Sequence, residues 1–251
     1  MSLTFYLIAA PVVFLFSGLT AMAGIGAAFL FVPFFYYLGV PLSEAAPVAL
    51  LLNAVSLSLA TVNYWRGQLI DWRVAFPVAV IAVVFAPIGA RLTPYVDKGT
   101  LLLLFALFLV FAGAMMLFYQ PQARSQGVGA EKVWLVGTGV GSVAGFVGGL
   151  LGVGGGNIIV PALNWLGLDT KRAAATSAVA VIFSSLSGFL GHATLGTMDM
   201  TMLGIMAIMA AGGSLAGSHL MKEKLSSYQL KKIIGVVLWL VAAKMFIDVF
   251  K

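Results

Sequence analysis

The sequence predicts an all-α polytopic membrane protein made of two pseudo-symmetric repeats, each a glycine-broken helix hairpin followed by three transmembrane helices. Of the 251 residues, 61% are hydrophobic and 9% are charged, and the mean hydropathy is +1.07. This is more apolar surface than one soluble core can bury. Both halves also begin with long uncharged stretches that contain glycine clusters. We therefore expect a single membrane domain over residues 1–251, with internal repeats at about 3–120 and 131–250.

The two uncharged stretches run from Ser2 to Ser43 and from Val133 to Leu168. A single helix of about 36 residues, the length of the shorter stretch, would be roughly 54 Å long, whereas the hydrocarbon core is about 30 Å thick. Two shorter helices that meet at the glycines fit the bilayer better. The predicted hairpins are therefore Leu3–Ala23 with Ile25–Leu38, and Val133–Leu151 with Asn157–Leu166.

Three ordinary apolar segments follow each hairpin, separated by chain breakers such as Gly67, Pro94 and Pro121. We also expect the first hydrophobic segment to be a retained helix, because it lacks the basic start and the cleavage site of a signal peptide. The predicted spans are Glu44–Tyr64, Trp72–Leu92 and Thr100–Tyr119 in the first repeat, and Lys171–His192, Met200–Leu220 and Tyr228–Phe250 in the second.

Residues of the two halves match at one constant offset of 128 residues, the distance from Gly24 to Gly152. Chance would not hold this register through about 70 residues, so the sequence predicts an internal duplication with its binding site where the repeats meet. The matching residues are Gly24, Gly26, Pro33, Gly39, Ser56, Asp71, Gly89 and Leu92, which correspond to Gly152, Gly154, Pro161, Gly167, Ser184, Asp199, Gly217 and Leu220.

The distribution of Lys and Arg favours repeats of opposite orientation. If each glycine-centred pair is a hairpin, a repeat has an odd number of elements, the second repeat is inverted, and ten basic residues share one side against three on the other. If each pair is one broken span, the repeats are parallel and the loops split eight to five. The positive-inside rule prefers the sharper asymmetry, so we predict inverted repeats with both termini outside the cytoplasm.

The glycine segments GIGAAFLFVP (Gly24–Pro33) and GVGGGNIIVP (Gly152–Pro161) are the strongest candidates for a site. They do not fit a dinucleotide-binding fold, because no strand–helix–strand unit surrounds them. Two membrane interpretations stay open: close helix packing through small residues, or a helix break whose amides and positive dipole end face an anionic substrate. In the second case the substrate-binding residues are Gly24, Gly26, Ala28, Gly152, Gly154, Gly155, Gly156 and Asn157.

A polar face adds candidates on the span after each hairpin. Asn53, Ser56 and Asn63 share one helical face, and Ser184 occupies the position equivalent to Ser56, with Ser177 two turns before it. We expect Asn53, Ser56, Ser177 and Ser184 to donate hydrogen bonds to the substrate. The alternative is that these side chains bond to neighbouring helices or to their own backbone.

Other polar residues indicate structural roles. Asp71 and Asp199 each precede a predicted span, where a carboxylate caps the first free amides. The sequence contains no cysteine, and no Ser–His–Asp set, HExxH motif or carboxylate dyad is visible inside a span. We therefore expect no enzymatic activity, no metal and no cofactor. The 14 Lys and Arg residues are scattered through short loops, so no nucleic acid is expected as a partner.

The segments GLLGVGGGNIIVPALNWLGLDTKRAAATS and AGIGAAFLFVPFFYYLGVPLSEAAPVA, each followed by a short element from Gly to Asp (GTMD and GQLID), resemble the TauE/SafE family, also called the 4-toluene sulfonate uptake permeases. The resemblance covers essentially the whole chain. It implies a transporter of a prokaryotic inner membrane that moves sulfite, sulfonates or other small sulfur-containing organic anions, often as an exporter. The first segment departs from the family pattern, since Ala27 and Ala28 stand where glycines are usual.

The leading hypothesis is therefore a secondary carrier that holds a small anion near the bilayer midplane, between the two hairpin breaks. The alternatives are a passive anion channel and a non-transporting membrane subunit. The expected partners are the anionic substrate and the lipid bilayer, with a proton as the simplest coupling ion and a second copy of the chain in a homodimer.

Overall fold

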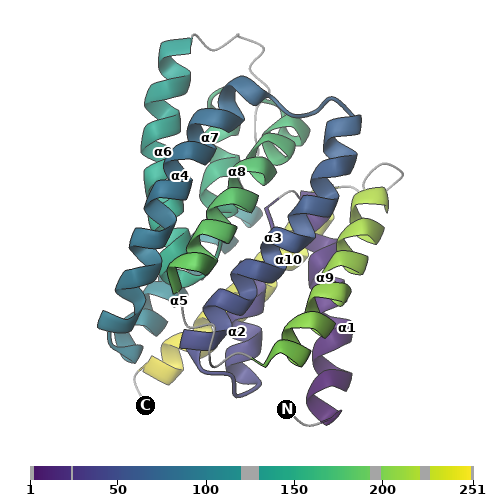
Figure 1. Cartoon of the computed structure of the whole chain (residues 1–251), viewed down its shortest axis with the longest axis vertical. Coiled ribbons are helices and arrows are strands. Elements are labelled where there is room, and N and C mark those ends of the chain that lie inside the picture. Colours follow the sequence, from purple (N-terminus) through teal and green to yellow (C-terminus); the bar gives the residue numbers. More distant parts are fainter. Residues whose placement is uncertain (1–2, 24, 120–129, 193–198, 221–226, 250–251) are drawn as a thin grey trace.

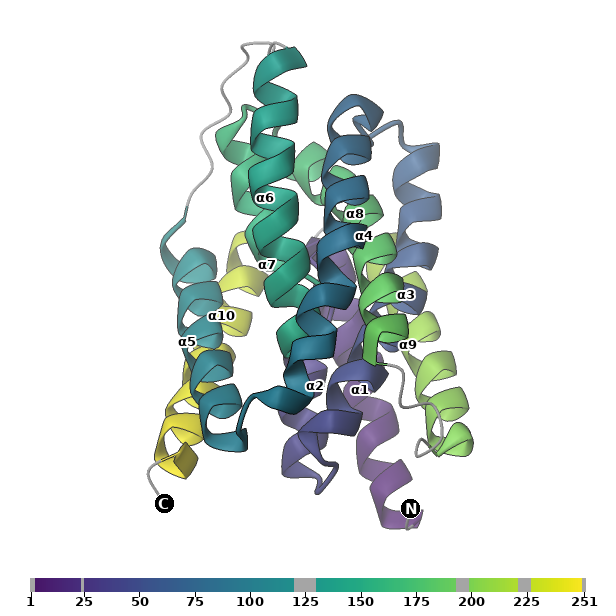
Figure 2. The same ribbon diagram turned by 60° about the vertical axis from the view of Figure 1, so that its left-hand side comes forward.

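The structure, a computed structural model, describes residues 3–23, 25–119, 130–192, 199–220 and 227–249 (Figures 1 and 2). These residues form ten α-helices and one short 3-10 helix, and no strand is present in the described ranges. The helices are α1 (Leu3–Ala23), α2 (Ala28–Tyr37), α3 (Leu42–Arg66), α4 (Trp72–Leu92), α5 (Lys98–Phe118), α6 (Ala130–Leu151), α7 (Gly156–Trp165), α8 (Thr170–His192), α9 (Met200–Leu220) and α10 (Ser227–Val249).

The all-α class and the predicted order of elements are confirmed. Seven of the helices within the described ranges are long and apolar enough to cross a membrane. Most helix bounds lie within a few residues of the predicted ones. One element was missed, the 3-10 helix Thr93–Tyr95, which lies between α4 and α5 and begins the turn that the sequence assigned to Pro94.

The two halves of the chain run in opposite directions. In Figure 1, α1 begins and α10 ends at the same lower end of the molecule, which we call the terminus end. By contrast, α6 begins at the opposite end, which we call the far end. The short helix α2 turns back toward the terminus end, and α7 turns back toward the far end, where α8 begins after four residues. Opposite directions are what inverted repeats require, while the duplication itself stays a prediction.

Helices of the first half pack on helices of the second half in equivalent pairs. Helix α1 packs on α9, and its counterpart α6 packs on α4, while α3 crosses α8 and α5 lies along α10. Both outer pairs depend on glycine for close backbone contact. A Cβ at Gly217 would lie 2.1 Å from the carbonyl oxygen of Gly18, and a Cβ at Gly149 would lie 1.9 Å from that of Ala86.

Carboxylates begin several of the long helices. Asp71 Oδ1 accepts a hydrogen bond from the Arg73 amide at 3.1 Å, and Asp199 Oδ1 accepts from the amides of Thr201 and Met202 at 2.9 and 3.1 Å. The two predicted N-caps are therefore confirmed. The hydrogen bond from the backbone N–H of Met202 is the main reason why the pKa of Asp199 lies below its usual value. Asp97 and Asp169 cap α5 and α8 in the same way.

Candidate functional site

Each hairpin turns at a glycine in the left-handed region of backbone space. Gly26 has φ +79° and Gly154, its equivalent at the constant offset, has φ +75°. The turns that follow the short helices α2 and α7 match as well, with φ +90° at Gly39 and +99° at Gly167. Only glycine adopts these angles without strain, which explains why the glycines keep their register in both segments. Gly24, the first residue of the predicted site, lies outside the described residues.

We call the turn in each hairpin, together with the start of the short helix that follows it, the tip of that hairpin. The two tips touch inside the protein. A Cβ at Gly156, the first residue of α7, would lie 2.2 Å from the carbonyl oxygen of Ile25 in the other tip. Gly152 packs against α3, where a Cβ would lie 2.5 Å from the Cβ of Ala46. Close packing through small residues, one of the two interpretations of these segments, is therefore present at both tips.

Asn53 of α3 ties the first tip to the second half of the protein. Its side chain is fully buried, and Oδ1 accepts hydrogen bonds from the amides of Ala27 and Ala28 at 2.7 and 3.3 Å. Its Nδ2 donates to Ser185 Oγ of α8 at 3.0 Å. The amide oxygen therefore fills the position at the start of α2 in which the sequence predicted an anion.

The second tip lacks this cap. The residue equivalent to Asn53 is Val181, which offers no acceptor, and α7 has no side-chain cap among the described residues. The atoms nearest to a Cβ at Gly154 would be Asn53 Nδ2 at 2.6 Å and Ser185 Oγ at 2.7 Å, with Val181 Cγ1 at 3.3 Å. The backbone differs at the next position too, because Ala27 has φ −109° whereas Gly155 has φ +78°. The amides of Gly155, Gly156 and Asn157 at the start of α7 thus have no side-chain cap like the one that Asn53 gives α2.

The predicted serines have unequal surroundings. Ser184 Oγ lies 3.2 Å from two possible acceptors, the carbonyl oxygen of Gly154 and that of Val181 in its own helix, so this hydroxyl contacts the second tip and is also placed for back-bonding. Ser177 Oγ donates to Ala174 of its own helix at 3.0 Å, as the back-bonding alternative expects. Ser56 Oγ is buried and has no hydrogen-bond partner within the described part of the chain.

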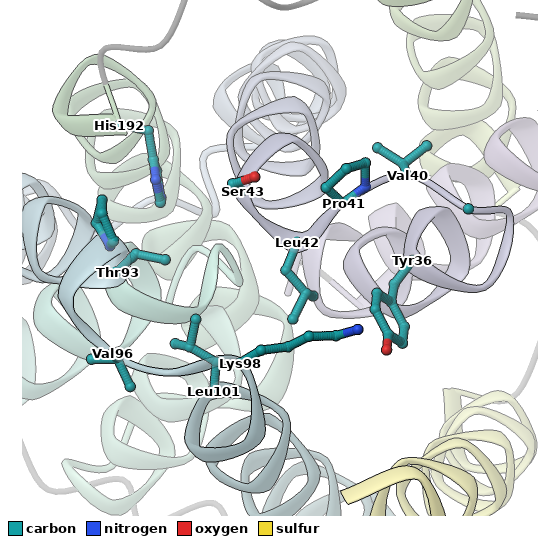
Figure 3. A pocket seen from close by; sticks show the side chains of 12 residues that line it. Tyr36, Val40, Pro41, Leu42, Ser43, Thr93, Val96, Lys98, Leu101 and His192 are labelled. Carbon is teal, nitrogen blue, oxygen red and sulfur yellow. The ribbon is translucent and has the colours of Figure 1, made fainter.

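A cavity of about 620 Å³ lies beside these buried residues and is built from different ones (Figure 3). It lies where α2 ends, α3 and α5 begin, and α4 and α8 end, which places it at the terminus end. None of the predicted site residues that the structure describes lines it. Its lining residues are Tyr36, Gly39, Val40, Pro41, Leu42, Ser43, Thr93, Pro94, Val96, Lys98, Leu101 and His192.

The inner wall of this cavity lies toward the hairpin tips. A much smaller void shares Leu42, Thr93 and Leu101 with it and is also lined by Ala46 and Leu151. Ala46 is the residue that Gly152 packs against. A thin apolar layer therefore separates the cavity from the second glycine segment.

Two basic side chains of the cavity were missed by the sequence analysis. Lys98 extends across the cavity toward Tyr36, with Nζ 5.4 Å from the centre of the ring (Figure 3). His192 Nε2 lies 3.0 Å from the carbonyl oxygen of Gly149, near the end of α6. A matching bond joins Tyr64, the residue equivalent to His192, to the carbonyl oxygen of Ala21 in α1. The constant offset was the one signal that could have linked these two pairs.

The fold and this geometry define a multi-pass helical membrane protein in which two opposed, broken hairpins meet, an architecture typical of membrane transporters. The chain belongs to the TauE/SafE family, because the family described as Sulfite exporter TauE/SafE matches residues 9–245. The predicted family is therefore confirmed, and the protein is a membrane transporter of this family.

Individual relatives carry related names. A probable membrane transporter protein of Methanocaldococcus jannaschii is 25% identical over 88% of this chain and 87% of its own length. One from Xylella fastidiosa is 28% identical over 78% of this chain and 75% of its own. A Sulfite exporter TauE/SafE family protein of Arabidopsis thaliana is 31% identical over 49% of this chain and 28% of its own length. No solved structure matches the chain.

Proposed function

We propose that the protein is a secondary carrier for small anions, with sulfite or organosulfonates as its substrates. The observation that carries this proposal is the difference between the two hairpin tips. The start of α2 is capped by Asn53 Oδ1, whereas the start of α7 has no side-chain cap among the described residues, and Val181 stands at the position equivalent to Asn53. Amides at the start of a helix bind anions without any change of protonation, so the α7 tip is the better anion site.

The cavity gives this site an access route. Lys98 supplies a positive charge to a cavity that is otherwise largely apolar, and a small anion is the ligand that such a charge attracts. The route continues toward Gly152 through the thin apolar layer described above. Movement of the hairpins against each other would open this layer, and alternating access in carriers has this form.

The charges at the helix ends support one orientation. The end of α3 and the starts of α4 and α8 lie at the far end (Figure 1), and these helix ends carry Arg66, Arg73 and Lys171. By the positive-inside rule the far end is cytoplasmic. The termini and the cavity then face the outside of a prokaryotic inner membrane, the side on which an exporter releases its substrate.

The sulfur-containing substrate and the direction of transport rest on the family name and on the Arabidopsis relative named a sulfite exporter. Flux of sulfite, sulfoacetate and acetate into proteoliposomes would test the assignment. We expect the two sulfur anions to be transported and to respond to an imposed proton gradient. Transport of acetate alone would disprove the sulfur assignment, and flux that ignores proton and sodium gradients would indicate a passive channel.

The substitution Val181→Asn tests the proposed site directly. A carboxamide at position 181 would cap the start of α7 as Asn53 caps α2, and would compete with the anion for the same amides. We expect sulfite flux to fall at least about tenfold, a loss of roughly 1.4 kcal/mol in transition-state stabilisation. Val181→Ala is the matched control, since it removes the same packing and adds no acceptor. Unchanged flux in a folded Val181→Asn protein would show that these amides do not bind the substrate.

A further inference from the structure

Asn164 of α7 is the most unusual polar residue in the described part of the chain. Its side chain is 3% exposed, and neither Oδ1 nor Nδ2 has a hydrogen-bond partner among the described residues. A buried carboxamide without partners costs several kcal/mol, because both of its polar groups have lost water and gained nothing. Such a side chain needs an explanation outside the conformation that the structure describes.

The position of Asn164 supplies this explanation. At the constant offset it is equivalent to Tyr36, which lies near the end of α2 and lines the cavity at the terminus end (Figure 3). Asn164 lies near the end of α7, which runs toward the far end. It therefore occupies in the second hairpin the place that Tyr36 occupies in the first, at the opposite end of the molecule.

A second carboxamide shares its helical face. Asn157 and Asn164 are seven residues apart, which is about two helical turns, so they lie on the same side of α7. Asn157 belongs to the second tip, and Asn164 lies about 10 Å further along the axis. The equivalent residues of α2 are Phe29 and Tyr36, and neither is a carboxamide. On this face of α7, the two side-chain carboxamides therefore form a line that begins at the proposed anion site and continues toward the far end.

We propose that Asn164 lines a second cavity, closed in this structure, that opens to the far end and takes the same small anion. The inference rests on the proposed carrier function. When this cavity opens, water and the anion supply the hydrogen bonds that Asn164 lacks here, and its Nδ2 donates to an oxygen of the anion. The exposed Lys171 and Arg172 at the start of α8 would form a positive rim that attracts the substrate.

The lack of cysteine in the sequence makes this inference straightforward to test. Single variants Asn164→Cys and Tyr36→Cys each carry one thiol, which can be labelled in oriented proteoliposomes with a membrane-impermeant maleimide. Sulfoacetate is the probe anion, because a sulfonate does not react with maleimide as sulfite does. Leu163→Cys is the control for local unfolding, since Leu163 is also buried in α7 and lies on a different face.

We expect Tyr36→Cys to be labelled from the terminus end, and sulfoacetate to raise the labelling rate of Asn164→Cys from the far end at least about fivefold. Leu163→Cys should stay unlabelled. The inference is overturned if Asn164→Cys stays unreactive with and without sulfoacetate, if it reacts from the terminus end, or if Leu163→Cys reacts equally. The last result would mean that α7 merely unfolds locally.

A second variant separates a transport role from a structural one. Asn164→Leu removes the unpartnered carboxamide, so we expect the thermal midpoint of the purified protein to stay equal or rise, while sulfoacetate flux falls at least about tenfold. Unchanged flux would overturn the role of Asn164. If the unmodified protein itself transports no sulfoacetate or sulfite, the carrier function fails; if it transports them and Asn164→Cys is never labelled, the second cavity alone fails.

Discussion

The starts of α2 and α7 share one left-handed glycine but differ in the backbone of the next residue and in their chemistry. Gly26 and Gly154 adopt nearly the same left-handed angle, and each lies two residues before a ten-residue helix. In the first tip, the following amides are bound by Asn53 from α3. In the second, Val181 stands in place of Asn53, and the start of α7 has no side-chain cap among the described residues. The first turn is therefore held by a side-chain cap, whereas the second keeps the free helix start that the proposed anion site requires.

The largest expected effect comes from separating the tips. Gly156→Ala would put a Cβ 2.2 Å from the carbonyl oxygen of Ile25, and backbone on both sides would have to move. We expect the free energy of unfolding in detergent micelles to fall by about 3 kcal/mol or more. Gly139→Ala in α6 is the matched control, since its Cβ would meet nothing within 4 Å. Equal stability of the two variants would mean that the tips do not hold each other in place.

Removing the cap of the first tip should have an intermediate effect. Asn53→Ala leaves the buried amides of Ala27 and Ala28 without their acceptor, and Ser185 without its donor. We expect a loss of about 2 kcal/mol in unfolding free energy. Ser185→Ala removes only one of these bonds and should cost less, as unfolding of both variants in the same detergent would measure. A larger loss for Ser185→Ala would show that Asn53 is not the central partner.

The smallest effect distinguishes two equivalent serines. Ser184 Oγ has acceptors in the carbonyl oxygens of Gly154 and Val181, both at 3.2 Å, whereas Ser56 Oγ is buried without a partner among the described residues. Ser184→Ala should therefore lower the free energy of unfolding by about 1 kcal/mol, while Ser56→Ala should leave it unchanged or raise it. Thermal unfolding of the two variants side by side gives the comparison. A greater loss at position 56 would contradict the described hydrogen bonding.

The spans and their boundaries could be predicted because the signals are local. Uncharged stretches, glycines and prolines occur in the sequence next to the helix ends that they determine. Asp71 and Asp199 directly precede the helices that they cap, and a carboxylate in that place has few other uses. The opposite directions of the two halves followed from the count of elements and from the placement of Lys and Arg.

The partners of the site residues could not be predicted in this way. Asn53 bonds to amides 25 and 26 residues before it and to Ser185, 132 residues after it, so its partners depend on how three helices cross. The cavity is built from the ends of five described helices, and no single stretch of the sequence indicates that it exists. Its basic residues, Lys98 and His192, look like ordinary helix-end residues until the helices are packed.

The contact of the two tips also determines where a membrane voltage would act. A cavity of about 620 Å³ reaches inward from the terminus end, and water in such a cavity shortens the insulating part of the path. The voltage then falls mainly across the remaining protein, which includes the contact between Ile25 and Gly156. Moving one elementary charge through 100 mV is worth about 2.3 kcal/mol. An anion that passes between the tips, as proposed, would cross part of this voltage in that step, so the rate of the step would depend on the membrane potential.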